Sequence, residues 1–474
     1  MNPSATLALL PLLLLAGTSV VVMLGIAVKR SHALTAALTL AGLACAFASI
    51  FVAARHIPQQ ATSLLFLDSY ALFYIGLIIA SAAAVAAFSY SYIEKHPVHR
   101  EELYLLLLLS TLGCATLAAS VHLVSFLLGL EILSVSLYAM VAYFNDCEQP
   151  VEAGIKYLIL ASTSAAFLLF GAALIYADTG TMAFSGFHAA SRDAAGLALL
   201  LPGIALTVTG IGFKLGVVPF PLWTPDVYEG APAPVTAFVA TASKTALVAL
   251  LFRFLPFALQ SRAVLLVFAV IAIASMCAGN LLAIRQTNVK RILAYSSIAH
   301  FGYILAAFQV GGPMAAEAVA FYLVAYVTSI LIAFGVVAAL STSAGDAGDL
   351  EEYRGLFWRR PLLAGIFTLS LLSLAGIPAT MGFLGKFYVL AAGVASAAWL
   401  LMIVLVVTSV AGLFYYLRIV VALFSAAPDG APALQSLSPG SVFVLCGLAA
   451  LLLFFGMYPA PLLGLLGAVM AGMT

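Results

Sequence analysis

Residues 212–221 read Gly-Phe-Lys-Leu-Gly-Val-Val-Pro-Phe-Pro, and they interrupt a long run of apolar residues. Proline removes a backbone hydrogen-bond donor and clashes with the preceding helical turn, while glycine permits irregular dihedral angles. Gly216, Pro219 and Pro221 therefore predict that a helix unwinds here. Lys214 places a charge beside the break.

A second stretch of this kind reads Gly376-Ile377-Pro378 and is followed by Lys386. We expect this helix to unwind as well, so that freed carbonyls and helix ends line a polar cavity beside a lysine. An ordinary proline kink is the alternative interpretation of each break.

The composition around these breaks is that of an integral membrane protein. The 474 residues are 64% hydrophobic and only 8% charged, far outside the range of soluble proteins. Lipid offers no partner to open backbone, so apolar runs that cross about 30 Å of hydrocarbon must be helices. We predict an all-α membrane protein with no soluble domain, whose first span is retained and not removed as a signal peptide.

Fourteen spans are predicted, with the two breaks in spans 7 and 12. They cover residues 5–27, 34–54, 70–93, 103–120, 122–144, 154–177, 196–220, 233–257, 263–284, 289–309, 315–340, 361–392, 396–425 and 441–470.

An internal repeat appears when the chain is compared with itself at an offset of 165 residues. The offset places Glu152 on Glu317 and Tyr157 on Tyr322. Span 6 then matches span 11, and helices five spans apart run in opposite directions. We therefore predict two inverted five-helix repeats, spans 4–8 and 9–13, as in transporters whose ion pathway lies near broken helices. The predicted parts are a three-helix segment (1–100), the two repeats (101–258 and 259–426) and a C-terminal helix (427–474).

Basic residues in the loops predict the orientation. With the N-terminus outside, eleven Lys or Arg residues lie at the inner side and four, namely Arg55, Arg192, Arg253 and Arg262, at the outer side. Both termini are therefore expected outside. The net charge of +1 and the short loops predict no nucleic-acid partner.

Five charged residues interrupt, or lie just inside, apolar runs: Glu131, Lys156, Lys214, Lys244 and Lys386. A charge near the bilayer centre costs about 2.5–3.5 kcal/mol even on a lenient scale, so such groups are kept for use or in tight pairs. Desolvation favours loss of the proton from a buried lysine, and an approach of Glu131 to Lys214 would couple their protonation states. The sequence predicts proton transfer; a structural ion pair is the alternative.

Two further residues are possible proton relays. Lys156 lies near the entrance of its span, so its side chain could equally extend to the interface. His300 could relay protons between the lysines, or be a buried histidine with satisfied hydrogen bonds. We interpret the aromatic residues of the spans as lipid-facing and interfacial.

The sequence predicts no metal or cofactor in this chain. The five cysteines are scattered without a C-x-x-C pair, and no Gly-rich phosphate loop follows a strand. Redox chemistry is therefore expected elsewhere.

Three long stretches carry a family resemblance: His122 to Tyr138, which contains Leu130-Glu131-Ile132-Leu133; Gly212 to Pro234; and Lys290-Arg-Ile-Leu-Ala-Tyr-Ser-Ser-Ile-Ala-His300. They resemble the antiporter-like membrane subunits of respiratory complex I, in the superfamily that also contains Mrp antiporters. The resemblance covers nearly the whole chain.

The resemblance implies a proton channel in a bacterial inner membrane. In it, Glu131 and Lys214 would form a coupled pair, Lys244 the central relay and Lys386 the terminal donor or acceptor toward the outer side. NADH, FMN, iron–sulfur clusters and quinone would be bound by partner subunits, beside neighbouring antiporter-like and small helical membrane subunits and lipids.

One branch of the family is favoured by three features: lysine at position 386, the sequence of residues 223–234, and the end of the chain after span 14. The other branches are expected to have glutamate at this site or a long C-terminal extension. An Mrp-type cation/proton antiporter subunit, a membrane-bound hydrogenase subunit and a scaffold that only anchors partners remain the alternatives.

Overall fold

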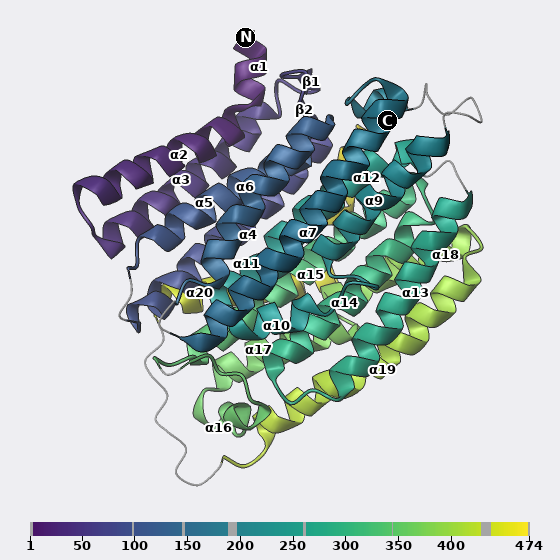
Figure 1. The fold of residues 1–474 in the computed structure, drawn as a ribbon. Helices are drawn as coiled ribbons and strands as arrows, with labels where there is room; N and C mark the ends of the chain where they lie inside the picture. The colour runs from purple at the N-terminus through teal and green to yellow at the C-terminus, as the bar shows by residue number, and fades with distance from the viewer. Residues whose placement is uncertain are drawn as a thin grey trace.

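The computed structural model describes residues 3–96, 99–144, 147–187, 197–258, 262–343, 345–427 and 438–472. Arg192 and the predicted start of the second repeat at Leu259 lie outside these ranges. Within them the chain is almost entirely helical (Figure 1). The sheet in the described ranges is a two-residue antiparallel ladder between β1 (Gln59–Gln60) and β2 (Phe66–Leu67).

The helices follow the predicted spans closely. In the first half they are α1 (Pro3–Ala8), α2 (Leu10–Val28), α3 (His32–Ala53), α4 (Ser69–Glu94), α5 (Glu102–Ala119), α6 (Leu123–Val141), α7 (Glu148–Thr179), η1 (Phe184–Gly186), α9 (Leu197–Leu215), α10 (Trp223–Gly230), α11 (Ala233–Phe238), the π-helical turn η2 (Val239–Ser243) and α12 (Lys244–Ala258). In the second half they are α13 (Arg262–Ile284), α14 (Val289–Phe308), α15 (Gly312–Leu340), η3 (Leu350–Tyr353), α16 (Leu356–Arg359), α17 (Pro361–Ala375), α18 (Met381–Ala395), α19 (Trp399–Phe424), α20 (Pro439–Met457) and α21 (Ala460–Ala471).

Thirteen helical segments of the described chain are long and apolar enough to cross a membrane. The predicted span 12 is absent from this set because it consists of two 15-residue helices, α17 and α18. The all-α membrane fold is thus confirmed. One span was predicted wrongly as a single helix: residues 441–470 divide into α20 and α21, because Pro459 and Pro461 interrupt the helical hydrogen-bond pattern.

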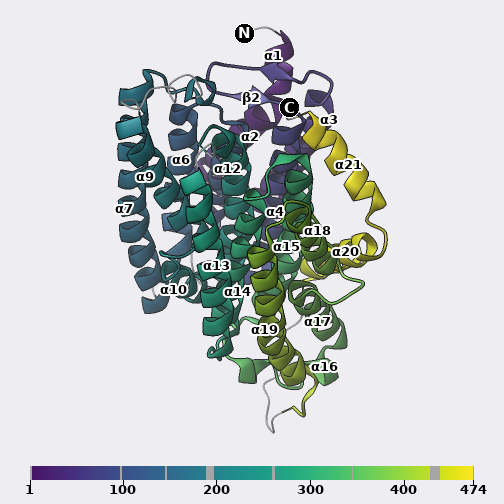
Figure 2. The ribbon, with the colours of Figure 1, turned by 90° about the vertical axis from the view of Figure 1, so that its right-hand side faces the viewer.

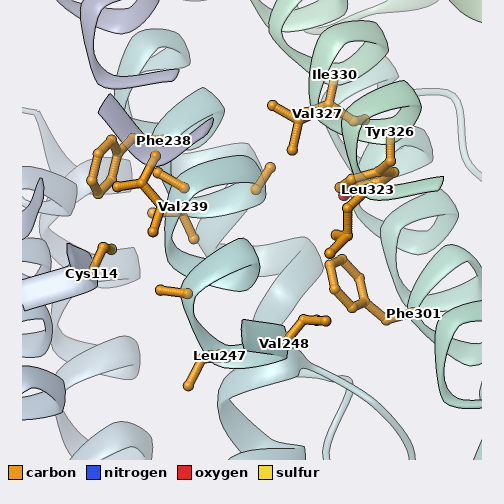
Figure 3. Close-up of a cluster of buried hydrophobic side chains, with 14 of the residues drawn as sticks. Cys114, Phe238, Val239, Leu247, Val248, Phe301, Leu323, Tyr326, Val327 and Ile330 are labelled. Carbon is orange, nitrogen blue, oxygen red and sulfur yellow. The ribbon is translucent and has the colours of Figure 1, made fainter. Parts of the chain in front are cut away.

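The centre of the bundle consists of α11–α12, α14 and α15. In the most apolar 18 residues of the segment 233–254, every residue is buried. In the corresponding 18 residues of α2 and of α20, only 28% of the residues are buried. Figure 3 shows Val239 of the π-helical turn and Val248 of α12 in one buried apolar cluster with Phe301 of α14 and Val327 of α15. Charged side chains in these central helices are therefore surrounded by protein.

The two ends of the chain lie at the same end of the bundle. In Figures 1 and 2 the N- and C-terminal labels are together at the top, and Gly472 lies beside Ser69 at the start of α4. We call this end the terminal face. Because α4 crosses the bundle, Lys95 at its other end marks the opposite face.

Candidate functional site

The first predicted break is present between α9 and α10. Helix α9 ends at Leu215, and Gly216 has a φ of +73°, a conformation that favours glycine. The indole nitrogen of Trp223, at the start of α10, donates a 2.8 Å hydrogen bond to the carbonyl of Phe213. The two half-helices are thus tied together across the break.

Lys214 lies in the last turn of α9, and its side chain is buried. Its ammonium group donates a 2.6 Å hydrogen bond to the Ser134 hydroxyl and lies 5.8 Å from the ring centres of Tyr138 and Tyr157. Glu131 interacts with it electrostatically, but the two form no ion pair. The expected close approach is therefore replaced by a contact with Ser134, one helical turn beyond Glu131.

Lys244 follows the π-helical turn directly and is completely buried. Its ammonium group donates a 2.7 Å hydrogen bond to Ser297 of α14, which also accepts a 2.7 Å bond from the Tyr326 hydroxyl. The ring centres of Phe301 and Tyr228 lie 4.7 and 5.6 Å from the nitrogen. Aromatic faces and one hydroxyl thus compensate for this charge.

His300 lies one turn beyond Ser297 on α14 and is 3% exposed. Its Nδ1 is 2.5 Å from the Tyr322 hydroxyl, and its Nε2 is 3.1 Å from the Tyr416 hydroxyl. Tyr416 also contacts the Ser296 hydroxyl. Every ring nitrogen of this histidine therefore faces a group that can exchange protons.

The second break lies between α17 and α18, as predicted. Gly376 has a φ of +86°. The buried ammonium group of Lys386 donates 2.9 Å hydrogen bonds to the carbonyls of Leu374 and Ala375, at the end of α17, and a 2.7 Å bond to Ser409. The expectation that freed carbonyls lie beside a lysine is confirmed at this break.

Close packing makes the second break sensitive to added volume. A methyl group on Gly382 would lie 1.9 Å from the Ser373 carbonyl oxygen, whereas one on Gly365 would meet nothing within 4 Å. We expect Gly382→Ala to destabilise the protein by at least about 1–3 kcal/mol. Gly365→Ala is the matched control and should be neutral or slightly stabilising. Thermal unfolding of the two variants measures this, and equal stability would contradict the packing of the break.

Lys214, Lys244, His300 and Lys386 are all buried on packed helices of the bundle, and we refer to these four groups as the buried layer. Most of the side chains that surround them were not predicted: Ser134, Ser297, Tyr322, Tyr326, Tyr416 and Ser409. The interpretation of the aromatic residues as lipid-facing is wrong for many tyrosines, including Tyr228, Tyr303, Tyr322 and Tyr416, which are at most 2% exposed. Ser134 lies one helical turn from Glu131 on α6, and Ser297 lies one turn from His300 on α14, so this spacing could have indicated both serines. Nothing in the sequence indicates Ser409.

Lys156 lies outside this layer. Its ammonium group forms ion pairs with Glu152 at 2.7 Å and Asp226 at 3.2 Å, and 45% of its side chain is exposed. Arg291 joins the same surface network through Asp226 and Glu229. Lys156 is thus a half-exposed member of an ion-pair network.

A cavity of about 550 Å³ opens at the opposite face between α4, α14 and the loop after α15. The side chain of Lys290 on the cavity wall is 2% exposed and pairs with Asp346 at 2.5 Å. Burial and the nearby Asp349 carboxylate raise the pKa of Glu352 on the cavity wall. In the cavity wall, the protonated form of the Glu352 carboxyl group is therefore favoured.

A second buried ion pair lies near the terminal face. Arg253, expected at the outer surface, pairs with Asp68, and both side chains are at most 9% exposed. Asp68 also accepts a 2.7 Å hydrogen bond from the backbone nitrogen of Ala71 and so caps α4. This pair joins α12 to the start of α4.

Comparison with known proteins places the chain in a family. The family model described as NADH:quinone oxidoreductase/Mrp antiporter, transmembrane, matches residues 120–412, a range that contains both breaks and the four buried groups. The chain belongs to the NADH:quinone oxidoreductase/Mrp antiporter family. A curated member from Ectopseudomonas mendocina (strain ymp), named NADH-quinone oxidoreductase subunit N, is 47% identical over 97% of this chain and 95% of its own length.

Solved structures of the family share this fold. A chain of respiratory complex I from Thermus thermophilus with bound aureothin is 33% identical, with a TM-score of 0.83 over 96% of this chain and 98% of its own. A chain of the Mrp complex from Dietzia sp. DQ12-45-1b has a TM-score of 0.88 at 22% identity, over 99% and 97% of the two chains. The branch favoured by Lys386 and the segment at 223–234 is that of subunit N, in agreement with the name of the curated relative.

Proposed function

We propose that this chain is the subunit N type of proton-translocating membrane subunit in a bacterial NADH-quinone oxidoreductase. It would contain no redox group of its own and would move protons across the membrane, driven by quinone reduction in other subunits. The observation that carries this proposal is the buried layer of Lys214, Lys244, His300 and Lys386, each hydrogen-bonded to hydroxyl or carbonyl groups.

Burial makes the protonation state of these side chains sensitive to their surroundings. An ammonium group in an apolar interior is unstable relative to water, so a small change in its surroundings can decide whether it keeps its proton. Glu131 is the acidic group that acts on Lys214. A charge shift that alters this interaction would change the proton affinity of Lys214 and pass along the layer. Lys244 would then act as the central relay and Lys386 as the terminal donor or acceptor.

The direction of transport follows from the orientation that the loop charges predict. The terminal face would be the outer side of the inner membrane, and the cavity bounded by Lys290, Asp346 and Glu352 would face the cytoplasm and collect protons. The partners would be neighbouring antiporter-like and small helical membrane subunits. NADH, FMN, iron–sulfur clusters and quinone would be held by other chains of the complex.

Inverted membrane vesicles and the intact complex test the function. We expect NADH oxidation to acidify the vesicle interior without any requirement for sodium, and mass spectrometry of the purified complex to find partners with flavin and iron–sulfur clusters. Sodium counterflow, or a complex made only of antiporter-type subunits, would contradict the proposal and favour an Mrp-type antiporter. The fold alone does not separate the two, because it is shared.

A further inference from the structure

Helix α20 packs directly against the backbone of the second helix break. A Cβ at Gly456, near the end of α20, would lie 2.6 Å from the carbonyl oxygen of Ala379 and 2.8 Å from the backbone nitrogen of Met381. Real Cβ atoms essentially never approach other atoms this closely, so a side chain at position 456 would force backbone to move. The break and α20 are therefore in contact at a point where only glycine fits.

The residue that Gly456 contacts has an unusual backbone conformation. Ala379 has a φ of +67°, which residues other than glycine rarely adopt. Such a conformation persists only where the surrounding structure holds it in place. The contact with Gly456 makes α20 part of that surrounding structure.

Helix α20 is itself fixed to the bundle. Its buried residues Leu445, Ala449, Leu452 and Gly456 follow one another at intervals of three or four and so form one face of the helix. Leu445 is completely buried and lies against α15, where a Cβ at Gly335 would be 2.9 Å from its side chain. Extra volume at position 456 would therefore displace the break more readily than the helix.

The position of the break determines how Lys386 meets its acceptors. Lys386 is on α18, whereas the two carbonyls that accept its hydrogen bonds are at the end of α17. Between them, the Thr380 hydroxyl donates a 2.6 Å hydrogen bond to the carbonyl of Ile377. The amide of Ile377 in turn donates a 3.0 Å bond to a carbonyl in the last turn of α17. A shift of this loop would therefore move the ammonium group relative to its acceptors.

We propose that α20 clamps the second helix break and that Gly456 is a positioning residue for proton transfer at Lys386. Gly456 acts through the backbone of Ala379 and carries no proton itself. This inference rests on the proposed function and deepens it, because it gives the C-terminal part of the chain a role in the step at Lys386.

The assembled complex carrying Gly456→Ala tests the clamp. Misplacement of a reacting group by about 1 Å can slow a reaction by about 100-fold, so we expect pumping to fall by about 10- to 100-fold. The matched control is Gly447→Ala on the same helix, because a Cβ at Gly447 would meet nothing within 4 Å. This control should pump normally.

Thr380→Val is a second variant that adds no bulk between α20 and the break. Valine preserves the shape of threonine but removes the hydroxyl that ties the loop to Ile377. We expect it to reduce pumping as well, and Thr380→Ser, which keeps the hydroxyl, to restore it.

The readout is the pH gradient formed by inverted vesicles, measured per assembled complex and over a range of pH. Displaced acceptors change how readily Lys386 releases its proton, so the pH dependence of pumping by Gly456→Ala should differ from that of the unmodified complex. A merely structural role would lower the amount of assembled complex and leave this pH dependence unchanged. Normal pumping or an unchanged pH dependence of assembled Gly456→Ala would overturn the clamp. If Gly456→Ala does not assemble, normal pumping by Thr380→Val would overturn it.

Lys386→Ala separates failure of the clamp from failure of the proposed function. If Gly456→Ala pumps normally while Lys386→Ala does not, the clamp fails and the proposed function stands. If Lys386→Ala in a fully assembled complex also pumps normally, the proposed function itself fails.

Discussion

Replacement of Lys244 by alanine is expected to abolish proton pumping by the assembled complex. The side chain is completely buried and is the central member of the layer, with Ser297 as its hydrogen-bond partner. Loss of a positioned proton-transfer group typically slows the reaction by about 10²–10⁴-fold. The pH gradient formed by inverted vesicles on addition of NADH measures the effect, with the amount of assembled complex as reference.

Two control variants separate charge from proton transfer. Lys244→Arg keeps a cation that does not release its proton, so we expect it to stop pumping as well. Lys29→Ala removes an exposed lysine near the end of α2 and should have no effect. Normal pumping by Lys244→Ala in a fully assembled complex would show that this lysine has only a structural role.

Removal of Lys290 is expected to destabilise the protein strongly. Its three donors are all used, by the carbonyls of Glu229 at 2.8 Å and Ala231 at 2.7 Å and by Asp346 at 2.5 Å. Asp346 also accepts a 2.8 Å hydrogen bond from Tyr92 of α4. Lys290→Met would leave the carboxylate uncompensated, and breaking a buried pair in this way costs about 3–5 kcal/mol.

Thermal unfolding and the yield of assembled complex measure this loss. The double variant Lys290→Met with Asp346→Leu removes both charges and should recover part of the stability. The exposed pair between Arg354 and Glu351 provides the control, since Arg354→Met should change stability by less than about 1 kcal/mol. Unchanged stability of Lys290→Met would contradict the role assigned to the buried pair.

The sequence was sufficient for the fold because hydropathy, proline and glycine act locally. The breaks at Gly216 and Gly376 follow from backbone restrictions that are independent of neighbouring helices. The division of the last span at Pro459 was missed, although it has the same cause. Its apolar residues continue on both sides, and hydropathy does not register a kink.

The contacts of the site could be predicted only in part, because they join helices far apart in the sequence. Lys244 and Ser297 are 53 residues apart, and His300 and Tyr416 are 116 residues apart. The lysines themselves were evident from their cost in an apolar span. The hydroxyl group that accepts a hydrogen bond from each ammonium group is determined by helix packing. Glu131 was therefore expected as the partner of Lys214, whereas in the structure the partner is Ser134.

The central claim is that the buried lysines belong to one hydrogen-bonded route across the membrane. A cryo-EM map of the assembled complex at a resolution that shows ordered water tests it most directly. We expect water and hydroxyl groups in continuous hydrogen-bonding contact from Lys214 to Lys244, and onward through His300 to Lys386. Ammonium groups separated from one another by dry, apolar packing would contradict it.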